Sequence, residues 1–193
     1  MAANTLHTCI DDLVEFVPNK TKTPSIRAGV IDVNKAYKFA LPPSWREVQV
    51  ANIQSGNFCM PRCDEPWTEV IFTADKEGKL QLIVAPLNRL TRKANASLSD
   101  IGPPEGIVES LGNFITGTYL DVDDVVFSEK KQTDGRLYYL YETNASYGTN
   151  GPHCLSSVTT KGDLAYLFVV SANDKQWAKS ESKLREVVQS FRA

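Results

Sequence analysis

Two cysteines four positions apart are the residues in this sequence best suited to chemistry. They bracket the CxxxC segment Cys59-Met60-Pro61-Arg62-Cys63, which lies in a long polar stretch. A turn here can bring the two Cα atoms within the roughly 4.4 to 6.8 Å that a disulfide requires. Closing so short a loop adds little stability, so a disulfide here suits redox regulation better than structural stabilisation. A static disulfide, a regulatory redox pair activated by Arg62, and zinc ligation stay open, although no second CxxC completes a zinc site.

The other two cysteines are far apart in the chain. Cys9 lies near the N-terminus and Cys154 lies at the start of a predicted late strand. A disulfide between them would close a long loop, and long loops gain the most stability in theory. We favour this pairing, which would fasten the N-terminal segment across the sheet. The alternative is that Cys154 is reduced and acts as a small buried hydrophobe.

The sequence offers few residues for histidine-based catalysis, because His7 and His153 are its only two histidines. The sequence also lacks a dinucleotide fingerprint, a P-loop, a nucleophile elbow and a HExxH motif. His153 and Cys154 are adjacent, but consecutive side chains on a strand point to opposite faces and cannot form a catalytic dyad. We therefore predict that the protein is not an enzyme.

An acidic segment offers oxygen ligands of the kind that calcium prefers. Asp121, Asp123 and Asp124 lie within four residues. The segment lacks the spacing of a calcium-binding loop and has no carboxylate at the twelfth position. We interpret it as a solvated turn in preference to a calcium site.

Strand patterns surround these residues and must position them. Short apolar runs, most of them alternating and separated by glycine and proline turns, predict strands at 37–41, 48–50, 68–72, 80–84, 125–130, 137–142, 156–160 and 165–170. Asp134-Gly135 and Gly162 mark the turns of two hairpins, since glycine supplies the positive φ that such turns require. Hairpins imply antiparallel pairing.

Two helical patterns accompany the strands. Pro103-Pro104 opens one helix, and the other follows Asn173 and Asp174, which are candidate N-caps. Each carries apolar residues on one face, so each is expected to pack on the sheet. The pattern predicts an α+β fold in which helices cover an antiparallel sheet. Residues 1–34 are interpreted as an extension with at most one or two helical turns, and 35–193 as the domain.

Composition narrows the classes of function. The chain has 193 residues, 42% of them apolar, which is enough for one domain with a sizeable core. Its formal charge of −2 lacks the basic character of a nucleic-acid binder, so we exclude nucleic acid as the main partner. No apolar run approaches the roughly 20 residues that span a bilayer, so we expect a protein that is at most peripheral to the membrane.

Several segments, taken in order, resemble the PsbP domain family. They are Tyr37-Lys38-Phe39-Ala40-Leu41-Pro42-Pro43-Ser44-Trp45, Val50-Ala51-Asn52-Ile53, Ala172-Asn173-Asp174-Lys175-Gln176-Trp177 and Val187-Val188-Gln189-Ser190-Phe191. The resemblance covers about residue 35 to the C-terminus. It implies a central antiparallel sheet flanked by helices on both faces, an α/β/α sandwich. The cysteine loop is typical of a paralogue within this family and not of the oxygen-evolving subunit itself.

The resemblance implies a non-enzymatic accessory protein of the chloroplast thylakoid lumen, reached after removal of a transit peptide. The expected partner is photosystem II or an assembly intermediate, with a role in assembly or regulation and no required cofactor. A redox-responsive disulfide at Cys59 and Cys63 would add a thioredoxin-like reductant as a partner. The alternative is a static docking module whose disulfides are purely structural.

The resemblance also implies one metal-binding pair. A family histidine before a late strand and an aspartate before the last helix fall on His153 and Asp174 of this sequence. Two ligands would give only weak binding of a divalent cation such as Mn²⁺, Zn²⁺ or Ca²⁺. Asp174 has an equally good structural role as the N-cap of the last helix.

Overall fold

The computed structural model describes residues 13–21, 23–50 and 67–193. Its helices and strands follow one another in the order β1 (Val14–Phe16), α1 (Pro24–Arg27), η1 (Val33–Lys35), β2 (Phe39–Leu41), β3 (Arg46–Val48), β4 (Trp67–Ala74), β5 (Gly78–Pro86), η3 (Leu87–Arg89), α2 (Leu98–Ile101), α3 (Pro104–Thr116), η4 (Val122–Asp124), β6 (Val125–Thr133), β7 (Arg136–Asn144), β8 (His153–Lys161), β9 (Leu164–Ala172) and α4 (Asp174–Ser190), where η marks a 3₁₀ helix.

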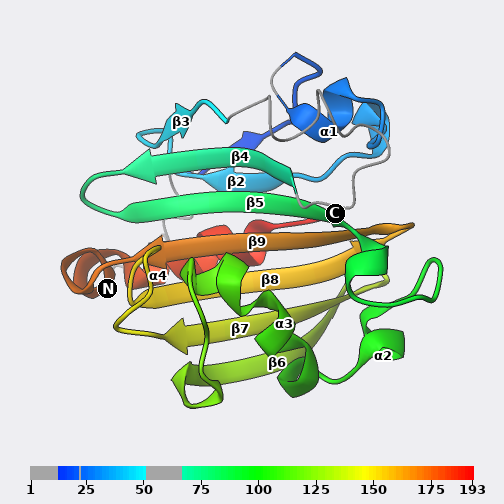
Figure 1. Ribbon diagram of the computed structural model, residues 1–193. Helices are drawn as coiled ribbons and strands as arrows, with labels where there is room; N and C mark the ends of the chain where they lie inside the picture. The colour runs from blue at the N-terminus through cyan, green and yellow to red at the C-terminus, as the bar shows by residue number, and fades with distance from the viewer. Residues whose placement is uncertain (1–12, 22, 51–66) are drawn as a thin grey trace, which may run out of the picture.

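Seven of the strands in the described chain form one antiparallel sheet, in the order β3-β4-β5-β9-β8-β7-β6. The antiparallel sheet predicted from the sequence is confirmed (Figure 1). Three tight hairpins build it, and the two predicted at Asp134-Gly135 and Gly162 have positive φ at these residues. β9 lies at the centre although it is the last strand, so the end of the chain closes the sheet.

The first face of the sheet carries the larger core. Alternate residues of β5 and β9, such as Leu82 and Phe168, point to this face and are fully buried there. The helix α4 adds Leu184 and Val187. Phe168 lies parallel to Phe191, with ring centroids 4.8 Å apart. The end of the chain is therefore part of the core.

The second face is covered by α3, which lies in front of the sheet in Figure 1, while α4 lies behind it. Ile107, Leu111 and Ile115 of α3 pack on the strand residues that alternate with those of the first face, such as Leu167 of β9. Beside α3, over β5 and β9, is a hollow of about 190 Å³ lined mainly by apolar side chains. The coverage of this face is thus less complete than that of the first.

The N-terminal segment packs on the first face. The strand β1 pairs antiparallel with β2, and Ile26 and Ile31 are buried in the same core as α4. This strand was not predicted, because its three residues show too short a pattern to recognise. The division of the chain at residue 34 stays a prediction.

Several predicted boundaries differ from the structure. The strand expected at 48–50 is β3, which ends at Val48, and the strand expected at 37–41 begins at Phe39. Lys38 instead forms an isolated bridge to Arg192. Short edge elements next to prolines carry little periodicity, so their ends are the least predictable.

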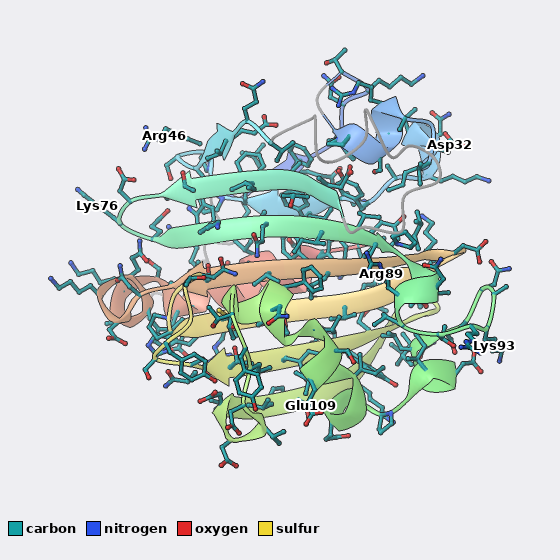
Figure 2. All side chains as sticks on the ribbon, viewed as in Figure 1. Asp32, Arg46, Lys76, Arg89, Lys93 and Glu109 are labelled. Atoms are coloured by element: carbon teal, nitrogen blue, oxygen red, sulfur yellow. The ribbon has the colours of Figure 1, made fainter. Side chains whose placement is uncertain are left out.

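Most charged side chains lie on the outside of the fold. Figure 2 shows Glu109 on the outer side of α3, with Arg46 and Lys76 at one end of the sheet and Arg89 and Lys93 at the other. Among the residues the structure describes, no helix has the length and apolar character that crossing a bilayer requires.

Candidate functional site

The sheet and the last helix bring His153 and Asp174 together. His153 begins β8 and is paired with Ala172 near the end of β9, and α4 begins two residues later at Asp174. The His153 Nε2 and Asp174 Oδ1 atoms are 2.9 Å apart. The imidazole is 16% exposed and the carboxylate 87% exposed. The pair that the family resemblance implied is therefore in direct contact, with its aspartate open to solvent.

The start of α4 frees this aspartate from a capping role. Asn173 is the N-cap: its side chain accepts a hydrogen bond from Gln176 N, and the Gln176 side chain accepts one from Asn173 N. The expectation that Asp174 could be the N-cap is therefore wrong, since Asp174 is the first helical residue. A carboxylate in the first turn interacts favourably with the helix dipole. Because Asn173 caps the helix, the oxygens of Asp174 are available to His153.

A stack of planar groups supports the imidazole. The Trp177 ring lies on the His153 ring, with centroids 4.8 Å apart and planes 7° apart. The Arg185 guanidinium lies 5.4 Å from the centre of the Trp177 ring. Arg185 pairs with Glu142 at 2.9 Å and with Glu181 at 2.7 Å. The hydrogen bond from Arg185 to Glu142 contributes most to raising the pKa of Arg185, so this end of the stack stays charged.

The sequence predicted the pair His153 and Asp174 but not the stack of His153, Trp177 and Arg185. Trp177 was named only as part of a segment that resembles the family. The spacing carries a signal, because Trp177 and Arg185 lie three and eleven residues after Asp174 on α4. These intervals place all three side chains on one face of a helix.

The donor set at this corner fits a weakly held divalent cation. His153 Nε2 and Asp174 Oδ1 are the two donors that would hold it, with water completing the shell. An imidazole nitrogen suits Mn²⁺ or Zn²⁺ better than Ca²⁺, which takes oxygen ligands. Among the described residues, no group of three or more His, Cys, Asp and Glu side chains lies close enough to hold a metal. The arrangement can bind a cation weakly or act as a hydrogen-bonded pair.

Cys154 is buried on the other face of the sheet and forms no disulfide with any residue that the structure describes. Its Sγ lies 3.5 Å from Ile115 O, and burial raises the pKa of the thiol to about 12. His153 faces α4, so the two neighbours form no catalytic pair, as strand alternation predicted. The structure agrees with the alternative of a small buried hydrophobe. Cys9 lies outside the described residues, and its pairing with Cys154 stays a prediction.

The remaining cysteine and histidine predictions concern Cys59, Cys63 and His7, which lie outside the described residues. The acidic segment is described. Asp121 Oδ1 accepts a hydrogen bond from Asp123 N at 3.1 Å, and Asp124 accepts one from Asp121 N at 3.2 Å. These carboxylates cap the helix η4, in agreement with a turn.

A buried carboxylate was missed by the sequence analysis. Glu69 is 1% exposed; it accepts hydrogen bonds from Ser25 N at 2.8 Å and from Tyr37 Oη at 3.1 Å. Burial raises the pKa of Glu69 and also that of Tyr37. The strand register shifts between Thr68 and Val70, which makes Glu69 the extra residue of a bulge. Glu69 thereby faces the core with Val70, where strict alternation would have turned it outward.

Comparison with known proteins identifies relatives over most of the chain. The PsbP family model matches residues 28–193. The chain is 42% identical to PsbP domain-containing protein 6, chloroplastic, of Arabidopsis thaliana over 92% of its own length and 67% of that protein. It is 31% identical to PsbP domain-containing protein 4, chloroplastic, of the same plant, over 81% of its own length and 55% of that protein. The chain thus spans about half to two thirds of these relatives.

The fold has a solved counterpart. The solution structure of cyanobacterial PsbP, CyanoP, from Synechocystis sp. PCC 6803 superposes with a TM-score of 0.56 at 17% identity. The match covers 99% of this chain and 98% of CyanoP, so the two proteins share one fold. The resemblance inferred from the sequence motifs is confirmed by the family match and by the 42% identical relative. The chain belongs to the PsbP family.

Proposed function

We propose that this protein is a non-enzymatic accessory protein of the chloroplast thylakoid lumen that docks on photosystem II or one of its assembly intermediates. The family match over residues 28–193 carries the proposal. Two further relatives support the location, since their names place them in the lumen: the thylakoid lumenal 19 kDa protein, and a photosynthetic NDH subunit of lumenal location, both of Arabidopsis thaliana.

Co-purification from solubilised thylakoids tests this role. The chain carries an affinity tag, placed so that the pairing of Lys38 with Arg192 stays intact. Enrichment of photosystem II subunits over an untagged control is the expected result. Enrichment of NDH subunits alone, or of no photosynthetic complex, would contradict the proposal.

The proposed regulation is a redox-responsive disulfide between Cys59 and Cys63, reduced by a thioredoxin-like protein. Their spacing supports it, and so does the burial of Cys154, which leaves that thiol poorly suited to exchange. A thiol-labelling titration against a dithiol buffer, with Cys59→Ser as control, measures the potential. If the pair stays unreactive down to about −300 mV, the disulfide is a static staple and the protein is a static docking module.

The third element is weak binding of Mn²⁺ or Zn²⁺ by His153 and Asp174. Their 2.9 Å contact and the exposure of the carboxylate support it. Titration of Mn²⁺ followed by its electron paramagnetic resonance signal should show one saturable site. We expect His153→Ala to abolish the site and Asp163→Asn, a distant carboxylate change, to leave it. Equal binding by both variants would exclude the pair as ligands.

A further inference from the structure

A group of exposed apolar side chains surrounds the helix η4. Eight large apolar side chains are strongly exposed in the described chain, and four of them fall in this group, between 47% and 68% exposed. We call these four the η4 patch: Tyr119, Val122, Val126 and Tyr147. Exposed apolar side chains that gather in one place, with polar groups around them, mark sites of interaction.

Hydrogen bonds and a bulge hold the η4 patch in one place. The Tyr147 hydroxyl contacts the Asp124 carboxylate and accepts a hydrogen bond from Asp121 N at 3.1 Å. These bonds fasten the loop between β7 and β8 to η4. The register of β6 shifts between Val125 and Phe127, which makes Val126 an extra residue beside Phe127. Tyr147 is therefore held beside η4.

The charge around the patch is negative. Asp121, Asp123 and Asp124 lie within it, and none forms an ion pair with any residue that the structure describes. The hydrogen bond to Asp124, with the charges of Asp124 and Asp121, raises the pKa of Tyr147. A surface of this kind complements apolar side chains accompanied by lysine or arginine.

We propose that the η4 patch docks a protein segment that presents aromatic or aliphatic side chains together with lysine or arginine. The inference rests on the proposed accessory role, which requires a docking surface.

Other occupants fit less well. An anionic lipid surface would be repelled by the three carboxylates. A second copy of this chain, related by a two-fold axis, would place the acidic patch against itself. Strand addition to β6, the edge strand in Figure 1, is opposed by the bulge and by Lys130 and Lys131 along the strand.

Site-specific photo-crosslinking tests the proposal with the full chain. Benzoylphenylalanine replaces Val126 in one protein and Val48 in a matched control; Val48 is also exposed and lies on β3, at the opposite edge of the sheet. Each is irradiated with detergent-solubilised thylakoids, and the crosslinked peptides are sequenced. We expect about tenfold more crosslinking from position 126, to segments that combine apolar residues with lysine or arginine.

Two further variants separate the apolar from the electrostatic contribution. Tyr119→Ser in the position-126 protein should lower the crosslink yield about tenfold. Asp123→Asn should lower it about twofold and weaken its dependence on salt, whereas Glu109→Gln, on the outer side of α3, should not change it (Figure 2). Unchanged thermal unfolding midpoints would show that each variant is folded.

Three outcomes would overturn the proposal: equal yields from positions 126 and 48, crosslinks to lipid, or crosslinks to a second copy of this chain. Failure of the patch proposal can be told apart from failure of the proposed function. Photosystem II subunits retrieved by the tagged chain without excess crosslinking at position 126 would reject only the patch. Crosslinks at position 126 to a basic, apolar segment of a protein outside photosystem II would reject only that partner.

Discussion

The two faces of the sheet are covered by different parts of the chain, and they differ in how completely they are filled. The first face receives α4 and the N-terminal segment, which are far apart in sequence, and its aromatic residues stack closely. The second face receives α2 and α3, inserted between β5 and β6, and retains a hollow of about 190 Å³. We therefore expect substitutions in the core of the first face to cost more stability than those in the second.

Matched leucine substitutions provide the strongest test of this difference. Leu184 of α4 is fully buried in the first face, whereas Leu111 of α3 lines the hollow of the second. We expect Leu184→Ala to lower the free energy of unfolding by about 4 kcal/mol and Leu111→Ala by about 2 kcal/mol, because Leu111 already borders a hollow. Urea unfolding at neutral pH measures both. Equal losses would show that the faces contribute alike.

The buried Glu69 sharpens the comparison, because it places an ionisable group inside the better-filled face. Burial raises its folded-state pKa above the unfolded value. Its contribution to stability is therefore fully present below the unfolded pKa of about 4.3 and is lost as the pH rises through the folded pKa. We expect the wild-type protein to lose stability relative to Glu69→Gln as the pH rises over this window.

Urea unfolding of both proteins at a series of pH values gives the measurement. The amide that replaces the carboxyl in Glu69→Gln keeps an oxygen that can accept from Ser25 N, so the variant retains one of the two contacts. Glu109→Gln, an exposed change, is the control and should show no such trend. A wild-type advantage that grows with pH would contradict the expected direction.

The Cys154 thiol probes the second face. Burial raises its pKa to about 12, so the native thiol should react with iodoacetamide about a thousandfold more slowly than an exposed cysteine. Mass spectrometry of labelled peptides, with a guanidinium-denatured control, measures the rate. Rapid labelling in the native state would show that α3 opens readily. If labelling of the denatured chain requires a reductant, Cys154 is in a disulfide, as the sequence favoured for Cys9 and Cys154.

Much of the fold could be predicted because its signals are local. The turns at Asp134-Gly135 and Gly162 fix two hairpins, and the alternation of β5 and β9 fixes their faces. The strand β1 and the burial of Glu69 could not be predicted. One depends on pairing with a distant short strand, and the other on a bulge that alternation does not reveal.

The candidate site also has a part that could be predicted from the sequence and a part that could not. His153 and Asp174 followed from family resemblance, and the stack on Trp177 depends on the exact position of α4 over the sheet. The η4 patch had no signal in the sequence, because Val126 resembles any strand residue. Its exposure results from the bulge and from the edge position of β6.

The smallest expected effect concerns the η4 patch, where stability and docking should separate. Val126 is 62% exposed, so Val126→Ser removes almost no buried contact, and we expect a change within about 0.5 kcal/mol in the free energy of unfolding. The Leu184→Ala protein, for which we expect a large loss of stability, is the comparison in the same urea experiment. A loss above about 1 kcal/mol would show that Val126 supports the fold, since surface residues without such a role rarely exceed this range. Its exposure would then reflect structure and not recognition.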